Sequence, residues 1–438
     1  MILKTRDEIK LEDGSVYTIE SLLGEGGQGE VYQVSNGNEK KALKLYKCDE
    51  SEDFKYNLRN NIKKGSPSKS FLWPQKYIET EDGHFGYLMD LRPNNYVSFI
   101  SYLNGKTLFK SLQIKLKWCT ELCLSFKKLH EQGYSYQDLN DGSFFLDPNT
   151  GELLICDNDN IAADKKNLGI LGKMRYMAPE IVRGDINPNT GEPQMPDIHS
   201  DRFSLAVILF MAMCLGNPFE GEVLKNYDII DENSDKEMYG TNPIFVYNKT
   251  DKSNRPIRGY HDIVIKYWSR LPVYIKEAFH RTFVDGLSDC ENGRTTELEW
   301  LKLIGRYRNE VVTCDGCGIE YILGINEIKR NEACPCCGRT TKKLLVLHIG
   351  KSDVVLDLGK KLYQTDFDKY SSEYDLEVGQ IISNPKRPDI WGIRIKGIGD
   401  VTMKDTEGKI CEVNDGGVIP IVKNLKIKLN NNMIGEMN

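Results

Sequence analysis

Apolar and polar positions follow one pattern before residue 100 and a different one after it. In the first part, short β-rich runs alternate with turn signals such as Asn36-Gly37 and Asp82-Gly83, which predicts an antiparallel sheet. From Leu108 to Phe126, apolar residues recur mostly three to four positions apart, which predicts helices. We therefore expect an α+β protein in which a small β-lobe, to about residue 92, precedes a larger α-lobe.

Three later segments complete this pattern. The apolar run from Phe203 to Gly216 is shorter than the roughly 20 residues that span a bilayer, so it predicts a buried helix. The run from Thr296 to Tyr307 predicts the last helix of the α-lobe. Beyond it, apolar runs predict the strands of a small all-β domain, at residues 344–349, 354–358, 379–383, 391–395 and 418–429.

Composition agrees with a folded chain of several domains. At roughly 150 residues per domain, 438 residues predict about three. The net charge of −6 argues against a basic surface for nucleic acid or a membrane, so we expect neither as a partner. The opening residues MILKTRDEIK contain no secretory or transit signal, and we expect a cytoplasmic protein.

A glycine-rich loop gives the first candidate site. Gly24, Gly26 and Gly29 have a spacing shared by dinucleotide-binding folds and protein kinases. A dinucleotide fold needs a helix directly after the glycines, whereas here a strand, a turn and a second strand at residues 41–46 follow, which is the kinase order. Lys44 on that second strand is placed to direct its ammonium at nucleotide phosphates, although an ordinary solvated lysine is the alternative.

Motifs further along the chain favour the kinase interpretation. Asp138, in the run Tyr136-Gln137-Asp138-Leu139, matches the catalytic base that accepts the proton of a substrate hydroxyl. Asp157 follows an apolar strand, where kinases place an aspartate that binds magnesium. Ala178-Pro179-Glu180 precedes Arg294, which predicts an ion pair between Glu180 and that arginine. The shared order of these motifs predicts a bilobal kinase-like fold.

Five longer runs carry a closer resemblance: 71–74 (FLWP), 86–89 (GYLM), 156–160 (CDNDN), 175–180 (RYMAPE) and 268–272. With these runs and the cysteine cluster that follows them, the chain resembles bacterial serine/threonine-kinase-like proteins of tellurite-resistance-type phosphorylation systems. Such proteins are encoded beside a metal-dependent phosphatase and a von Willebrand A protein. The resemblance implies ATP- and magnesium-dependent transfer to Ser or Thr, and it implies those two proteins as functional partners.

We assign the nucleotide and magnesium sites from these motifs. Lys44, Asp138 and Asp157 are the expected catalytic residues, and Asp157 and Ser143 are the expected magnesium ligands. The expected nucleotide-binding residues are Gly24, Gly26, Gly29, Val31, Lys44, Met89, Leu91, Ser143 and Asp157.

The sequence departs from the general kinase pattern at the metal site. Ser143 stands where that pattern has a metal-binding asparagine, and Asn140 or Asp141 is a displaced alternative. Asp157-Asn158-Asp159 replaces Asp-Phe-Gly, so we expect a segment that flips less readily.

Two further departures concern Lys44 and the loop after Asp157. The expected glutamate partner of Lys44 should come from residues 50–62, where only Glu50 and Glu52 are available. Residues 157–180 contain no Ser or Thr, and Gln137 replaces the arginine that receives a loop phosphate in many kinases. We therefore expect no switching by Ser/Thr phosphorylation of this loop.

Two Cys-x2-Cys pairs sixteen residues apart predict a tetrahedral zinc site. We assign Cys314, Cys317, Cys334 and Cys337 as ligands; Cys336 is the alternative to Cys337, but it breaks the paired spacing. Four thiolates leave no open position for water, so the zinc is expected to be structural. A reducing compartment disfavours disulfides.

These segments predict a kinase-like domain at residues 1–308, a zinc ribbon at 309–342 and a small all-β domain at 343–438. The last weakly resembles a forkhead-associated sandwich, with no phosphate-binding residue that can be assigned. The leading functional hypothesis is an active protein kinase. The alternatives are a pseudokinase scaffold, which Ser143 and the missing helix glutamate favour, and a small-molecule phosphotransferase.

Overall fold

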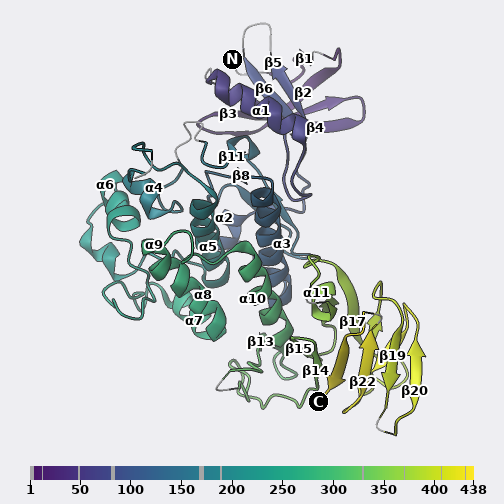
Figure 1. Cartoon of the computed structure of the whole chain (residues 1–438). Helices are drawn as coiled ribbons and strands as arrows, with labels where there is room; N and C mark the ends of the chain where they lie inside the picture. The colour runs from purple at the N-terminus through teal and green to yellow at the C-terminus, as the bar shows by residue number, and fades with distance from the viewer. Residues whose placement is uncertain are drawn as a thin grey trace.

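The computed structural model describes residues 4–438 except 12, 48–49, 80–83, 167–171, 188–189, 328–329, 369, 406 and 430. Figure 1 shows an N-terminal sheet at one end, a helical region in the middle and a C-terminal group of strands at the other end. The separate sheet and helical regions fit the α+β class. Among the described residues, no helix is long and apolar enough to cross a membrane.

The N-terminal sheet is antiparallel, with the strand order β1-β2-β3-β4-β6-β5. Asn36 pairs with Glu39 at the β3–β4 hairpin, and Gly37 takes a φ of 59° there, as the turn signal predicts. The second turn signal, Asp82-Gly83, lies outside the described residues. The strands are β1 Glu8–Lys10, β2 Val16–Glu25, β3 Gly29–Asn36, β4 Glu39–Tyr46, β5 Lys76–Glu79 and β6 Phe85–Asp90.

One helix, α1 (Glu52–Lys64), packs beside this sheet. Ser51 caps its first turn by accepting a hydrogen bond from Phe54 N at 3.2 Å. Phe54 and Leu58, one helical turn apart, are both buried and share a core with strands β4 and β6. These contacts fix one face of α1 against the sheet.

The helical region is built around α3 and α5. α5 is buried along most of its length, which explains the unbroken apolar run there, and Thr296, where the predicted last helix begins, is the N-cap of α10. Short strands β7 Val97–Ser98, β9 Phe144–Leu146 and β10 Leu153–Ile155 form one small sheet, and β8 Tyr134–Ser135 pairs with β11 Ala162–Ala163. The helices are α2 Phe99–Leu103, α3 Leu112–Glu131, α4 Pro179–Arg183, α5 Ile198–Cys214, α6 Glu232–Lys236, α7 Asp262–Arg270, α8 Val273–His280, α9 Gly286–Ser288 and α10 Glu297–Glu310.

After α10, β12 Val311–Thr313 and β13 Glu320–Ile322 pair across the first cysteine motif. The remaining strands form a six-stranded sheet, β15-β14-β23-β22-β19-β20, and a four-stranded sheet, β16-β17-β18-β21, which share one buried core. These strands, with the short helix α11 Gln364–Phe367, are β14 Val346–Ile349, β15 Ser352–Val355, β16 Lys361–Tyr363, β17 Glu377–Ser383, β18 Trp391–Ile395, β19 Val401–Lys404, β20 Ile410–Val413, β21 Val418–Pro420, β22 Lys426–Leu429 and β23 Ile434–Met437.

The single strand expected at residues 418–429 is wrong. The structure divides it into β21 and β22, which belong to different sheets. β21 ends at Pro420, which has no backbone N–H to continue a ladder. The chain then turns through Asn424, which takes a φ of 65°, before β22 begins.

Buried polar contacts join the C-terminal strands to the end of α10. Asn309 donates to Asp366 Oδ1 at 2.7 Å, and Lys360 Nζ donates to Asn309 O at 2.7 Å. Arg308 lies over the ring of Tyr363 and is 1% exposed. The C-terminal sheets are therefore packed on the helical region by specific buried contacts.

Candidate active site

Lys44 and Asp157 approach each other between the N-terminal sheet and the helical region. Lys44 is on β4 and is 5% exposed, and Asp157 follows β10. The Lys44 Nζ lies 3.8 Å from Asp157 Oδ1 and 2.7 Å from Asp159 Oδ2. Burial opposes the lysine charge, but these two carboxylates raise the pKa of Lys44 above its ordinary value. The ammonium is thus fixed by the segment that carries the predicted metal ligand.

Asp159 is the residue that sequence reasoning missed. It lies in the 3₁₀ turn η1 (Asn158–Asn160), is fully buried, and accepts hydrogen bonds from Lys44, Tyr46 and, at 3.2 Å, Tyr87. Burial alone would raise the pKa of Asp159, but Lys44 and Tyr46 hold it below its ordinary value. Asp159 is therefore the ionised partner of the lysine.

In the described part of the chain no glutamate of α1 pairs with Lys44, in agreement with the helix glutamate that is missing from the sequence pattern. Glu52 lies in the first helical turn with its side chain 83% exposed and pairs with Lys55 at 3.4 Å. Among the described residues, the carboxylates within 4 Å of the Lys44 ammonium are those of Asp157 and Asp159. Glu50, the other candidate, precedes the helix and is not one of these two partners.

α1 is instead fixed to the Asp157 segment by two amides. Asn57 and Asn61 each donate from Nδ2 to Ile161 O at 2.8 Å. They are one helical turn apart and are 7% and 1% exposed, so both face inward. A buried carbonyl with two amide donors holds this helix against residues 157–161 without an ion pair.

Asp138 lies in the loop after β8. Its Oδ1 accepts a hydrogen bond from Asn140 Nδ2 at 3.1 Å, and the Oδ1 of Asn140 accepts from Lys173 Nζ at the same distance. Burial raises the pKa of Asp138, while Asn140 and Lys173 counteract part of that effect. A more basic, oriented carboxylate is suited to accept a proton.

The predicted metal ligands lie on adjoining backbone segments. Cys156 N donates to Ser143 O at 2.8 Å, which places Ser143 next to the residue that precedes Asp157. Asn140 is engaged through both side-chain atoms, because its Oδ1 also accepts from Gly142 N at 2.9 Å, so Asn140 is poorly placed to substitute for Ser143.

The electrostatic surroundings of Asp157 fit a cation. Burial raises its pKa, and the carboxylates of Asp159 and Asp138 raise it further, against the effect of Lys44. Its side chain remains half exposed, and its backbone takes a left-handed φ of 55°. The crowding of carboxylates favours a divalent ion, which Asp157 and Ser143 would hold.

The predicted nucleotide-binding residues include a glycine-rich turn and an apolar cluster. Gly26 N donates to Gly29 O at 2.9 Å, and a Cβ added at Gly29 would lie 2.3 Å from Leu45 O, so Gly29 is required for the close approach of β3 to β4. A Cβ at Gly24 would meet no atom within 4 Å. Val31, Met89 and Leu91 belong to one apolar cluster near β4 and β6.

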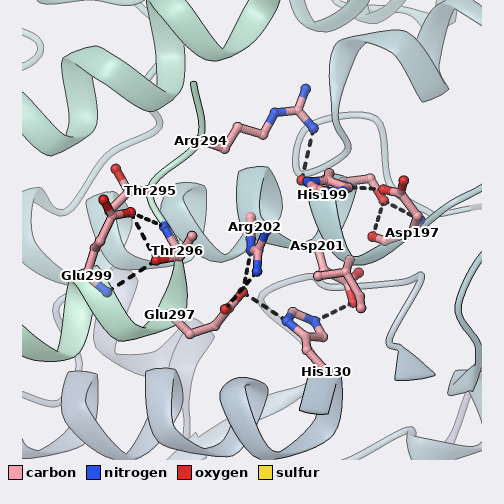
Figure 2. Close-up of polar contacts among 12 residues, drawn as sticks. His130, Asp197, His199, Asp201, Arg202, Arg294, Thr295, Thr296, Glu297 and Glu299 are labelled. Carbon is pink, nitrogen blue, oxygen red and sulfur yellow. Dashed lines mark hydrogen bonds and ion pairs between the residues drawn. The ribbon is translucent and has the colours of Figure 1, made fainter. Parts of the chain in front are cut away.

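A buried network of charged side chains contacts the loop that carries Asp138 (Figure 2). Asp201 on α5 accepts hydrogen bonds from Tyr136 N at 2.6 Å and Gln137 N at 3.3 Å. His130 lies between Asp201 and Glu297, with ring nitrogens 3.1 and 2.9 Å from their carboxylates, and Arg202 also donates to Glu297. The sequence shows Asp201 at the start of an apolar helix, but no local signal identifies His130 or Glu297 as its neighbours.

The same network determines the charge of His130. Burial opposes protonation, yet Asp201 and Glu297 raise the pKa of His130 to about 9. Conversely, His130 and Arg202 overcome the effect of burial and lower the pKa of Glu297 to about 2. A protonated histidine therefore links α3, α5 and α10 next to the loop that carries Asp138.

The ion pair predicted between Glu180 and Arg294 is confirmed. Arg294 Nη1 and Nη2 lie 2.7 Å from Glu180 Oε1 and Oε2, a bidentate pair, and Arg294 is 1% exposed. Between Asp157 and Glu180, residues 167–171 lie outside the described part of the chain. Tyr176, a tyrosine of this segment, is 2% exposed.

The four assigned cysteines gather at one point. The sulfur atoms of Cys314, Cys317, Cys334 and Cys337 all lie within 4.8 Å of one another. Gly316 N donates to Cys314 Sγ at 3.3 Å, and backbone amides lower the pKa of Cys314 to about 6, which favours the thiolate. Four sulfur donors supported by amides are suited to zinc, and Cys336 lies outside the group.

Comparison with known proteins supports the kinase interpretation of residues 17–266. A family model described as "Protein kinase domain" matches residues 17–266. Serine/threonine-protein kinase SCH9 of Saccharomyces cerevisiae is 26% identical over 216 residues, 46% of this chain and 24% of that protein. Ribosomal protein S6 kinase alpha-2 of Homo sapiens is 24% identical over 221 residues, 48% of this chain and 28% of that protein. The chain thus covers about a quarter of the length of these relatives.

Proposed function

The chain belongs to the protein kinase domain family, and from that premise we propose that it transfers the γ-phosphoryl group of ATP to Ser or Thr of a partner protein. The observation that carries the proposal is the convergence of Lys44, Asp157 and the buried Asp159, with Asp138 on a loop held by Asp201. Burying a lysine against two carboxylates costs desolvation free energy, which an ordinary surface lysine does not incur.

Each residue has a distinct part in the proposed reaction. When bound, magnesium and ATP supply the phosphoryl group and part of its charge neutralisation. Lys44 presents a fixed ammonium to the nucleotide phosphates, and Asp138 accepts the proton of the substrate hydroxyl. Asp157 and Ser143 are the proposed magnesium ligands, while Val31, Met89 and Leu91 form an apolar surface for the base.

We also propose the setting that the resemblance implies. The chain would act in a bacterial signalling or stress-response system, with a metal-dependent phosphatase reversing its reaction and a von Willebrand A protein as a further partner. In this proposal residues 1–308 form the kinase unit, residues 309–342 bind structural zinc through four cysteines, and residues 343–438 are an interaction module.

A specific observation favours one alternative. Ser143 replaces the asparagine that usually binds metal, and Asn140 is occupied by Asp138, Gly142 and Lys173. A scaffold that binds nucleotide without transferring phosphate would tolerate this arrangement.

Purified full-length protein with labelled ATP and magnesium or manganese distinguishes the two functions. Candidate partner proteins serve as acceptors, and Asp138→Asn serves as the matched control because it removes the base while keeping the side-chain size. The kinase proposal expects label transfer that disappears in Asp138→Asn while nucleotide still stabilises both proteins. Stabilisation by nucleotide without transfer in any sample supports the scaffold and contradicts the kinase.

A further inference from the structure

A cavity lies at the end of the helical region opposite the N-terminal sheet. Its volume is about 770 Å³, and its walls come from the start of α3, the turn between α7 and α8, and β13. Figure 1 shows β13 below α10 at this end of the molecule. The residues that line the cavity include none of those assigned to the nucleotide site.

Lys115, on the first turns of α3, is a buried cation in the wall of this cavity. It is 9% exposed, and its ammonium lies 5.0 Å from the ring centre of Tyr267. Within the described part of the chain, no carboxylate lies within ion-pair distance of its Nζ. Burial lowers the pKa of Lys115, and the groups that oppose this effect are the thiols of Cys119 and Cys214. A buried ammonium without an anionic partner costs free energy that a bound anion would offset.

Four further cations line the same cavity: Lys110, Lys266, Arg270 and Lys276. Its two carboxylates already accept backbone hydrogen bonds, Glu320 from Gln113 N at 3.1 Å and Glu327 from Val273 N at 2.9 Å. In the described structure neither carboxylate forms an ion pair with a cation of the cavity. The positive charge therefore exceeds the negative charge, and it is available to a ligand.

The cavity also offers aromatic surface. Tyr102, Tyr267, Tyr307 and Tyr321 contribute to its walls. Aromatic faces pack against planar rings, and lysine or arginine beside them binds phosphate, a combination suited to a nucleotide-like molecule. The volume is within the range of ordinary small-molecule pockets, so a ligand of that size can enter.

We infer that this cavity binds a small phosphorylated molecule that carries a ring, with Lys115 as the buried contact to its phosphate. The ligand would touch α3, α7 and the segment that carries the cysteines at the same time. Binding there would stabilise the packing of that segment on the helical region. This inference does not depend on phosphoryl transfer, because it concerns residues that the nucleotide site does not use.

Calorimetric titration of the full-length protein with inorganic pyrophosphate, and separately with ADP, tests the inference in buffer without added magnesium. Lys115→Met keeps the length of the side chain and removes its charge. Lys44→Met reports on the nucleotide site, and Lys252→Met changes an exposed lysine that does not line the cavity. Losing one charge-assisted hydrogen bond is expected to weaken binding about tenfold or more in Lys115→Met.

The expected result is a binding event for each probe that Lys115→Met weakens and that Lys252→Met leaves unchanged, with the ADP titrations made in the Lys44→Met background so that the nucleotide site is weakened. If Lys115→Met does not fold, Arg270→Gln, on the wall of the cavity, replaces it with the same expectation. No binding of either probe at millimolar concentration overturns the inference, and so does binding that only Lys44→Met reduces. Binding of pyrophosphate without a matching ADP site overturns the assignment of a ring-bearing ligand.

Discussion

Replacing Asp159 with asparagine tests whether this carboxylate holds Lys44. The side chain is fully buried, with Lys44 Nζ at 2.7 Å and Tyr87 Oη at 3.2 Å, and an asparagine at this position would keep its shape without its charge. Removing one partner of a buried ion pair costs about 3–5 kcal/mol. Asp157 Oδ1, 3.8 Å from the same ammonium, still offsets part of the lysine charge. We therefore expect the free energy of unfolding to fall by about 3 kcal/mol, measured by urea denaturation.

The same substitution should also reduce phosphoryl transfer. Without Asp159, the Lys44 ammonium would pair with Asp157 alone and would compete with the cation expected there. Loss of one preorganised electrostatic contact typically costs about 100-fold or more in rate, so we expect kcat/KM to fall by about that factor. The transfer assay is run below the unfolding temperature of the variant, verified by circular dichroism.

Two variants serve as controls for Asp159→Asn. Tyr87→Phe removes one neutral donor and should cost about 1 kcal/mol. Glu52→Gln changes one of the two carboxylates available near the start of α1, and since that side chain is 83% exposed, stability should change by less than about 0.5 kcal/mol. If Asp159→Asn unfolds like the wild type, or if Glu52→Gln reproduces its losses, Asp159 is not the anchor of Lys44.

Three further outcomes are expected. The protein should bind one zinc per chain by elemental analysis, and Cys334→Ser should lose it while Cys336→Ser retains it; equal retention would contradict the four-cysteine site. The pKa of His130 is about 9 in the folded protein against 6.5 in the unfolded chain, so its ionised form stabilises the fold fully below pH 6.5 and this contribution is lost as pH rises through 9. The free energy of unfolding of His130→Gln should therefore change less with pH than that of the wild type between pH 6.5 and 9. Phosphopeptide mapping of active protein should find no essential phosphate in residues 157–180, because that segment has no Ser or Thr.

Local patterns predicted much of the fold. The apolar run of α5 and the helical run from Thr296 to Tyr307 are each signals within one element, and both helices form where these runs predict them. The pair of Glu180 with Arg294 was also predictable, since both residues belong to an ordered set of motifs. The division of residues 418–429 into two strands was not predictable, because the apolar alternation continues past Pro420. Only the pairing in different sheets separates β21 from β22.

The partner of Lys44 was beyond local reasoning for a different physical reason. Asp159 lies 115 positions further along the chain, and its two neighbours Tyr46 and Tyr87 come from different strands. Three donors converge on one carboxylate only after the sheet has packed against residues 157–161. The cavity around Lys115 has the same character, because segments far apart in the sequence form it only once the chain has folded.

The location of Asp159 also bears on regulation. In protein kinases generally, a lysine that pairs with a helix glutamate depends on the position of that helix, which loop phosphorylation controls. Here the lysine partner and the proposed metal ligand are two residues apart, in one short segment, and α1 is bound to the same segment through Asn57 and Asn61. Moving α1 would break two amide hydrogen bonds but would leave the Lys44 ion pair in place. This arrangement, with the absence of Ser and Thr from residues 157–180, favours control through contacts outside the loop rather than through its phosphorylation.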